Sequence, residues 1–154
     1  MVHLGPAIGG EGGGEFNLYR DKPVKQLDVW YGSGSGDQFK QYTVLKGIEL
    51  RWNGDENPAR TGSTPSDTNQ SLLHTSFDFE NDGHEDLEWM DIWGSAGRVD
   101  SLRFLTERKK EGDYFAAGGV GGGKRIQPAH DRELCGFYGR SGDDIDKLGA
   151  VFNF

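Results

Sequence analysis

An acidic loop near the end of the chain holds the residues whose types and spacing are best suited to chemistry. It reads Gly142-Asp143-Asp144-Ile145-Asp146. Gly-Asp-Asp is also ordinary turn chemistry, so the motif by itself favours a plain turn. Glycoside hydrolysis needs two carboxylates across a cleft, whereas these lie on one tight loop. The motif therefore indicates an acceptor of hydrogen bonds, and an enzyme is the weaker alternative.

A glycine-rich run near the start of the chain is the second candidate. Residues 9–14, Gly-Gly-Glu-Gly-Gly-Gly, could be mistaken for a phosphate loop, but no strand precedes them and no helix with Lys-Ser/Thr follows. The four histidines show no metal-ligand spacing, and segment 81–86 is interpreted as a solvated acidic turn. Cys135, the only cysteine, is interpreted as a small buried hydrophobe. The sequence predicts no metal site and no cofactor.

Composition and charge limit the class of protein. The chain has 154 residues, of which 34% are hydrophobic and 25 are glycine. This apolar content suits a folded core, and the glycine content is too high for a helical bundle. The net charge of −8 disfavours nucleic acid and anionic membrane surfaces as partners. We therefore expect a single domain over residues 1–154, with no nucleic-acid partner and no direct membrane insertion.

Alternating apolar residues predict strands, and helical periodicity is nearly absent. The clearest runs extend over 27–31, 48–52, 102–104 and 148–154. Each run is bounded by Gly, Asn, Asp or Pro, as strands in a sandwich or barrel are. The sequence therefore predicts an all-β protein.

Three segments share one plan of aliphatic, polar and small residues ahead of a strand. They are residues 42–48, 96–102 and 142–148. A glycine-rich loop at 118–123 follows the second copy, and the run at 9–14 would do so for the third if the chain closes on itself. Three copies of one sheet unit around an axis predict a three-sided prism.

Both ends of the chain resemble the jacalin-related lectin family. Residues 5–16 are similar to the opening of these domains, and residues 136–149 resemble their closing motif. Residues 99–106 resemble a strand between them. The resemblance implies the β-prism I fold, three antiparallel sheets with a pseudo-threefold repeat. Ala7-Ile8 depart from the family pattern, and segment 53–70 is longer and more polar than usual.

The resemblance implies a metal-independent sugar site. In the family pattern the carboxylate of Asp146 accepts hydrogen bonds from two sugar hydroxyls, and such charge-assisted bonds are strong. The N–H groups of Asp143 and Asp144 donate to sugar oxygens, in a loop that Gly142 begins. Gly13 adds another N–H, because a residue without a side chain lets the sugar approach. We expect Asp144 to place a second carboxylate at the rim, which disfavours sialylated or sulfated glycans. The unbroken chain before Gly13 favours neutral mannose- or glucose-type glycans over galactose.

The same motif positions can be compared in the other two copies of the repeat. Asp100 takes the position of Asp146 in the second copy, and Gly122 lies in the loop expected to face it. Ala96 replaces the motif glycine, so a second site is expected in degraded form. Lys46 replaces the aspartate in the first copy, which we expect to bind no sugar.

Two other functions remain open. A prism with a decayed sugar site would dock protein partners through its aromatic surface, and a glycan-targeting domain would belong to a larger toxin or defence protein. Assembly into a homo-oligomer would raise avidity for glycans. The opening residues have neither a basic start nor an apolar run, so we expect a soluble protein, cytosolic or exported by a non-classical route.

Overall fold

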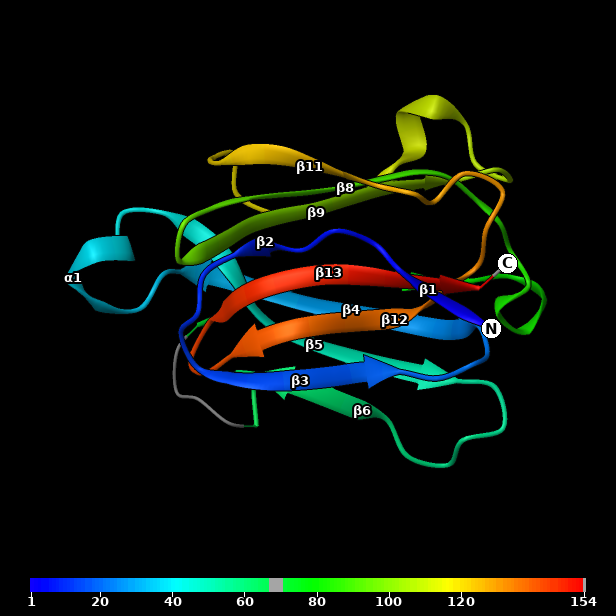
Figure 1. The fold of residues 1–154 in the computed structure, drawn as a ribbon, viewed down its shortest axis with the longest axis horizontal. Coiled ribbons are helices and arrows are strands. Elements are labelled where there is room, and N and C mark those ends of the chain that lie inside the picture. Colours follow the sequence, from blue (N-terminus) through cyan, green and yellow to red (C-terminus); the bar gives the residue numbers. More distant parts are fainter. Residues whose placement is uncertain (67–70, 154) are drawn as a thin grey trace.

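A computed structural model describes residues 1–66 and 71–153 (Figure 1). The described chain is mostly β-strand, which confirms the prediction of an all-β protein. Its strands form three antiparallel sheets, each built around one of the three repeat copies. Among the residues that the structure describes, no helix has the length and apolar character needed to cross a membrane.

The three sheets share one strand plan. The first contains β6 (Ala59–Gly62), β5 (Thr43–Trp52), β4 (Val24–Ser33) and β7 (Leu73–Asp78), in spatial order. The second contains β10 (Phe115–Gly118), β9 (Arg98–Thr106), β8 (Leu87–Ser95) and β11 (Gly123–Gln127). The third contains β1 (Val2–Leu4), β13 (Ile145–Asn153), β12 (Leu134–Ser141) and β3 (Gly14–Tyr19), with β2 (Ile8–Gly9) also paired to β13. The two central strands of each sheet form a hairpin, and the N-terminal strands complete the sheet that β12 and β13 begin, as the repeat predicted.

Inward-facing residues of the central strands form the core between the sheets, as alternation along a strand requires. The fully buried residues include Leu27, Val29, Ile48, Leu50, Trp52, Leu102, Phe104, Leu148, Ala150 and Phe152. Phe104 stacks on Phe79 and Phe115, with ring centroids 5.7 and 4.6 Å apart. Each fully buried large apolar side chain contributes roughly 1.5–3 kcal/mol. The predicted alternation is therefore confirmed as the packing pattern of the prism.

The single cysteine belongs to this core. Cys135 is buried, as predicted, and burial raises the pKa of its thiol to about 12. A thiol is nucleophilic only as the thiolate, so this residue is unreactive near neutral pH.

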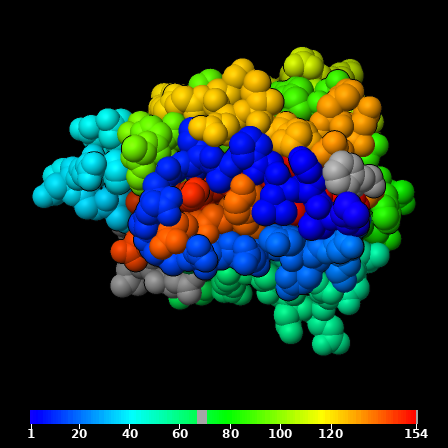
Figure 2. Space-filling model, viewed as in Figure 1, coloured from blue at the N-terminus to red at the C-terminus, as the bar shows by residue number. Residues whose placement is uncertain are grey.

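Short segments project from the ends of the prism. The helix α1 (Gly36–Phe39) lies between β4 and β5 and extends from the end at which β12 meets β13 (Figure 1). Two 3-10 turns, Asn81–Gly83 and Glu111–Asp113, lie near the other end. On the face shown in Figure 2, the N-terminal segment (blue) frames residues of β12 and β13 (orange to red).

Candidate functional site

Two loops that are distant in the sequence meet at one end of the prism. Residues 10–13 join β2 to β3, and residues 142–144 join β12 to β13. β3 and β12 pair antiparallel as far as the loops themselves, which brings the loops together. A Cβ atom on Gly142 would lie only 3.7 Å from the Cα of Gly13. The structure thus places the two predicted motifs on one surface.

Asp146, the second residue of β13, lies against the glycine loop with its side chain half-buried. A Cβ on Gly13 would lie 2.8 Å from its Oδ2 atom, and a Cβ on Gly12 would lie 3.3 Å from its Cγ atom. Within residues 1–66 and 71–153, this carboxylate makes no hydrogen bond and no ion pair. A half-buried acceptor without a partner is unfavourable unless solvent or a ligand satisfies it. Asp146 is therefore an open acceptor beside two glycines of the N-terminal loop.

The surroundings of Asp146 alter its acidity. Burial raises the pKa of its carboxyl group, and the nearby carboxylate of Asp144 raises it further. The Arg140 guanidinium acts in the opposite direction, and Asp143 adds a smaller increase. Hydrogen bonds donated to the carboxylate favour its ionised form. A ligand that brings hydroxyl groups to Asp146 would therefore relieve an unfavourable charge.

The glycine loop is held in place by an arginine that the sequence reasoning did not identify. Arg140 Nε donates to the carbonyl oxygen of Gly12 at 3.1 Å, and its Nη2 donates to that of Gly13 at 2.9 Å. Gly13 has a φ of +65°, and a Cβ there would clash with the carbonyl oxygen of Ser141. Only glycine therefore fits this position without strain. The sequence could have suggested this role, because Arg140 comes just before the acidic loop.

Asp144 is placed differently from the prediction. Its side chain is 10% exposed and forms an ion pair with the Nζ atom of Lys46. It also accepts hydrogen bonds from the backbone N–H of Ser35 at 2.8 Å and from the Ser35 hydroxyl at 2.7 Å. The expectation of a second carboxylate at the rim is therefore wrong, because this side chain points into the protein and its charge is paired. Asp144 consequently gives no reason to expect that sialylated or sulfated glycans are disfavoured.

The rest of the acidic loop presents backbone donors. The N–H of Gly142 is occupied, since it donates to the carbonyl oxygen of Asp144 at 2.9 Å. In the part of the chain that the structure describes, the N–H groups of Asp143 and Asp144 have no acceptor. The Asp143 side chain is exposed to solvent. The loop can thus offer two N–H donors beside the carboxylate of Asp146.

In the second copy an aspartate also faces glycines, but a side chain of the protein itself contacts its carboxylate. Asp100 faces Gly121 and Gly122, and a Cβ on either glycine would lie 2.7 Å from one of its carboxylate oxygens. Asp100 is fully buried, and Arg98 Nε donates to both of its oxygens at 3.1 and 3.0 Å. The Arg98 guanidinium also lies 3.8 Å from the centre of the Tyr42 ring. The carboxylate of Asp100 is therefore paired with an arginine, whereas its counterpart Asp146 is left open.

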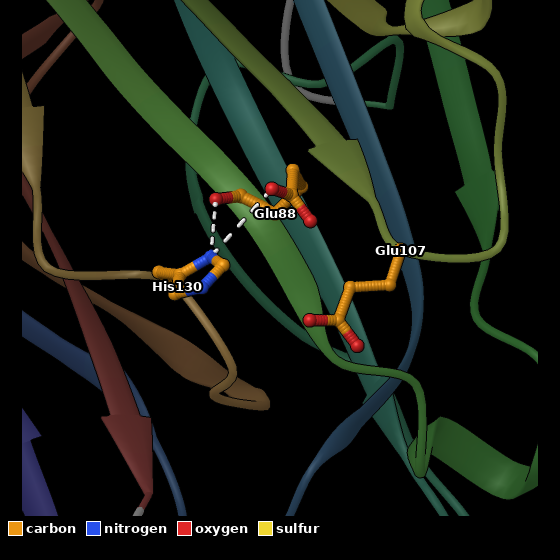
Figure 3. A group of neighbouring side chains, drawn as sticks. All are labelled: Glu88, Glu107 and His130. Carbon is orange, nitrogen blue, oxygen red and sulfur yellow. Dashed lines mark hydrogen bonds and ion pairs between the residues drawn. The ribbon is translucent and has the colours of Figure 1, made fainter.

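A second group of ionisable side chains lies at the opposite end of the prism. Glu88 on β8, Glu107 after β9 and His130 before β12 are exposed, and their ligand-type atoms lie within 4.8 Å of one another (Figure 3). His130 Nδ1 lies 3.7 Å from the Glu88 carboxylate, and its Nε2 lies 3.3 Å from that of Asp131. A hydrogen bond with Asp131 raises the pKa of Glu107 to about 7, with smaller contributions from burial and nearby carboxylates. The sequence prediction, which found no metal-ligand spacing among the histidines, did not anticipate this group.

Sequence comparison identifies the family. The profile of the Jacalin-like lectin domain matches residues 5–151. The chain belongs to this family. A relative, PYK10-binding protein 2 from Arabidopsis thaliana, is 29% identical over 156 residues that cover 99% of this chain and 47% of the relative. The chain thus spans about half the length of that curated relative.

Solved jacalin-type lectins share the fold. The mannose-binding lectin from Champedak is 18% identical, with a TM-score of 0.72 over 100% of this chain and 96% of its own. Single-chain recombinant jacalin is 14% identical, with a TM-score of 0.74 over 100% of this chain and 95% of its own. The predicted β-prism I fold is confirmed.

Proposed function

We propose that the chain binds neutral glycans of the mannose or glucose type at the end of the prism where the two loops meet. The site consists of the N–H groups of Gly13, Asp143 and Asp144, the glycine that begins the acidic loop, Gly142, and the carboxylate of Asp146. The observation that carries this proposal is the Asp146 carboxylate, which lies beside Gly12 and Gly13 and is unpaired among the described residues. The family match and the fold shared with a mannose-binding lectin support it.

The chemistry of the site suits a sugar. Hydroxyl groups donate to a carboxylate and accept from backbone N–H groups, and charge-assisted bonds to Asp146 are the strongest of these. A rigid loop loses little conformational entropy when the sugar binds. All donors and acceptors come from the protein, so binding is expected to be independent of metal ions. One such site binds a monosaccharide weakly, with a dissociation constant of about 0.1–1 mM.

The second copy is proposed as a weaker site in which the sugar competes with a residue of the protein. Asp100 and Gly122 have the arrangement of the first site, but the Arg98 guanidinium occupies both carboxylate oxygens. A sugar would have to displace two charge-assisted hydrogen bonds, so the affinity here is expected to be lower than at Asp146.

A glycan array tests the proposal with wild type, Asp146→Ala and the control Asp37→Ala. Asp37 belongs to α1 at the same end of the prism, and its side chain is 99% exposed. We expect binding to mannose- or glucose-containing glycans that persists with a chelator, persists in Asp37→Ala and disappears in Asp146→Ala. Binding that survives in Asp146→Ala would place the site elsewhere, with Asp100 as the first alternative.

Protein docking is the second candidate function. Ile126 on β11 is 65% exposed, and Tyr114, which directly precedes β10, is 46% exposed, with its ring 5.7 Å from that of Trp89 on β8. Aromatic residues of this kind are enriched in protein interfaces. A folded wild-type protein that binds no glycan on the array would favour this function.

A further inference from the structure

The first repeat copy, which has no aspartate for a sugar, makes contacts with the sugar loop of the third copy. Lys46 takes the position that Asp146 has in the third copy, and its side chain is 1% exposed. Its Nζ atom donates to the Asp144 carboxylate, to the Ser33 carbonyl oxygen at 2.9 Å and to the Ser35 hydroxyl at 3.1 Å. The three donors of the ammonium group are therefore all used.

Asp144 is satisfied by the same segment. Its Oδ2 atom accepts from the Ser35 N–H at 2.8 Å, and its Oδ1 atom accepts from both the Ser35 hydroxyl and Lys46. Ser33 and Ser35 lie at the end of β4 and just beyond it, before α1. One residue of the sugar loop is thus anchored to the first sheet through its charge.

Neighbouring residues of the loop contact the first sheet as well. The Ser63 hydroxyl donates to the carbonyl oxygen of Asp143 at 2.8 Å, and the hydroxyls of Thr61 and Ser141 are 2.5 Å apart. A Cβ on Gly62 would lie 2.9 Å from the Cδ1 atom of Ile145, which is fully buried. The sugar loop therefore lies on a platform made by residues 33–35, Lys46 and residues 61–63.

A buried ion pair is costly unless its hydrogen bonds are complete, and it then restricts the backbone that carries it to one geometry. We propose that Lys46 is a positioning residue of the sugar site. Through Asp144 it fixes the backbone whose N–H groups face the ligand, and through that turn it fixes the start of β13, where Asp146 lies. This inference rests on the proposed glycan binding, and it assigns the first copy to supporting the site of the third.

The test measures binding of methyl α-mannoside by calorimetry. Lys46→Met leaves the buried Asp144 carboxylate without its cation, and we expect the affinity to fall about tenfold or more. In Lys46→Met/Asp144→Asn neither charge is buried, and the amide oxygen introduced at position 144 still accepts from Ser35. The affinity of this double variant should therefore lie between those of Lys46→Met and wild type, because the unpaired buried charge is gone but the ion pair that positions the loop is still missing. Wild-type affinity in Lys46→Met would overturn the positioning role.

Trp52→Phe is the control for a general loss of stability. Trp52 is buried at the far end of β5, and its Nε1 atom donates to the carbonyl oxygen of Cys135 at 3.0 Å. This variant is destabilised without a change near the loop, so its affinity should stay within about twofold of wild type. If its affinity falls in parallel with its stability, the effect of Lys46→Met is structural and the inference is wrong. If Lys46→Met does not fold, Ser35→Ala replaces it, with an expected loss of about threefold and the same refuting outcome.

Hydrogen exchange without sugar separates this inference from the proposed function. In Lys46→Met the amides of Gly142 and Ser35, which donate to the carbonyl oxygen and the carboxylate of Asp144, should exchange about tenfold faster than in wild type, while those of β10 keep their rates. If wild type binds no sugar while Lys46→Met shows this faster exchange, glycan binding is refuted and the positioning of the loop by Lys46 is supported. Unchanged exchange at both amides refutes that positioning, whatever the sugar result.

Discussion

Removal of Arg98 should destabilise the protein more than removal of any ordinary surface arginine. Its Nε atom donates to both oxygens of Asp100, which is fully buried, and its guanidinium lies 3.8 Å from the centre of the Tyr42 ring. In Arg98→Ala the carboxylate keeps its buried position among the glycines of the 118–123 loop and loses both charged hydrogen bonds. The variant therefore tests whether the stability of the second copy depends on the pairing of Arg98 with Asp100.

The expected loss follows from the two contacts. Breaking a buried ion pair from one side costs roughly 3–5 kcal/mol, and the lower end applies because Arg98 is 15% exposed and water can enter after its removal. Loss of the contact with Tyr42 adds about 0.5–1 kcal/mol. A total of about 3–4 kcal/mol would lower the urea midpoint by roughly 1.5–2 M for a slope near 2 kcal/mol/M.

Urea unfolding followed by tryptophan fluorescence measures this shift. Arg103→Ala is the control, because Arg103 lies 5.0 Å from the centre of the Trp93 ring, donates one long hydrogen bond of 3.5 Å to the carbonyl oxygen of Gly119 and forms no ion pair among the described residues. It should lose only about 0.5–1 kcal/mol. Arg98→Ala/Asp100→Asn should recover part of the loss, since no charge is left buried. The reasoning is refuted if Arg98→Ala is as stable as Arg103→Ala, or if the double variant is less stable than the single one.

Three further predictions concern the sugar site and the opposite end of the prism. Gly13→Ala should abolish detectable mannoside binding and cost roughly 1–2 kcal/mol of stability in urea unfolding, because its φ is +65° and its Cβ would clash with the neighbouring strand; wild-type binding would contradict the proposed site. Sugar binding should weaken as the pH falls through the pKa of Asp146, and since burial raises this pKa, calorimetry from pH 7 downward should find the loss at higher pH than for an exposed aspartate. The pKa of Glu107 is raised from 4.5 to about 7, so the folded state binds this proton more tightly and gains stability below pH 4.5 that is lost as the pH rises to about 7. Glu107→Gln should reduce the change in the urea midpoint with pH over this range. An unchanged pH profile would show that the Glu107 carboxyl does not share a proton with Asp131.

Much of the fold was predictable because its signals are local. Alternating apolar residues and glycine-bounded runs identified the central strands, and the repeat at 42–48, 96–102 and 142–148 identified the three sheets. The pairing of Arg98 with Asp100 was also within reach, since residues two apart on a strand share a face. The group that includes Glu88, Glu107 and His130 was not, because its members come from three segments whose proximity depends on strand order.

By itself, the sequence determined the strand periods, the glycines that allow close approach and the loop that carries Asp146, since each depends on residues adjacent in the chain. Only the tertiary structure decided the roles of the two aspartates in that loop. Asp144 is buried because Lys46 lies beneath it, 98 residues away in the sequence, whereas Asp146 faces a glycine loop and keeps its carboxylate unpaired among the described residues. Two identical side chains thus differ in charge pairing because a carboxylate takes its role from the groups that surround it in space.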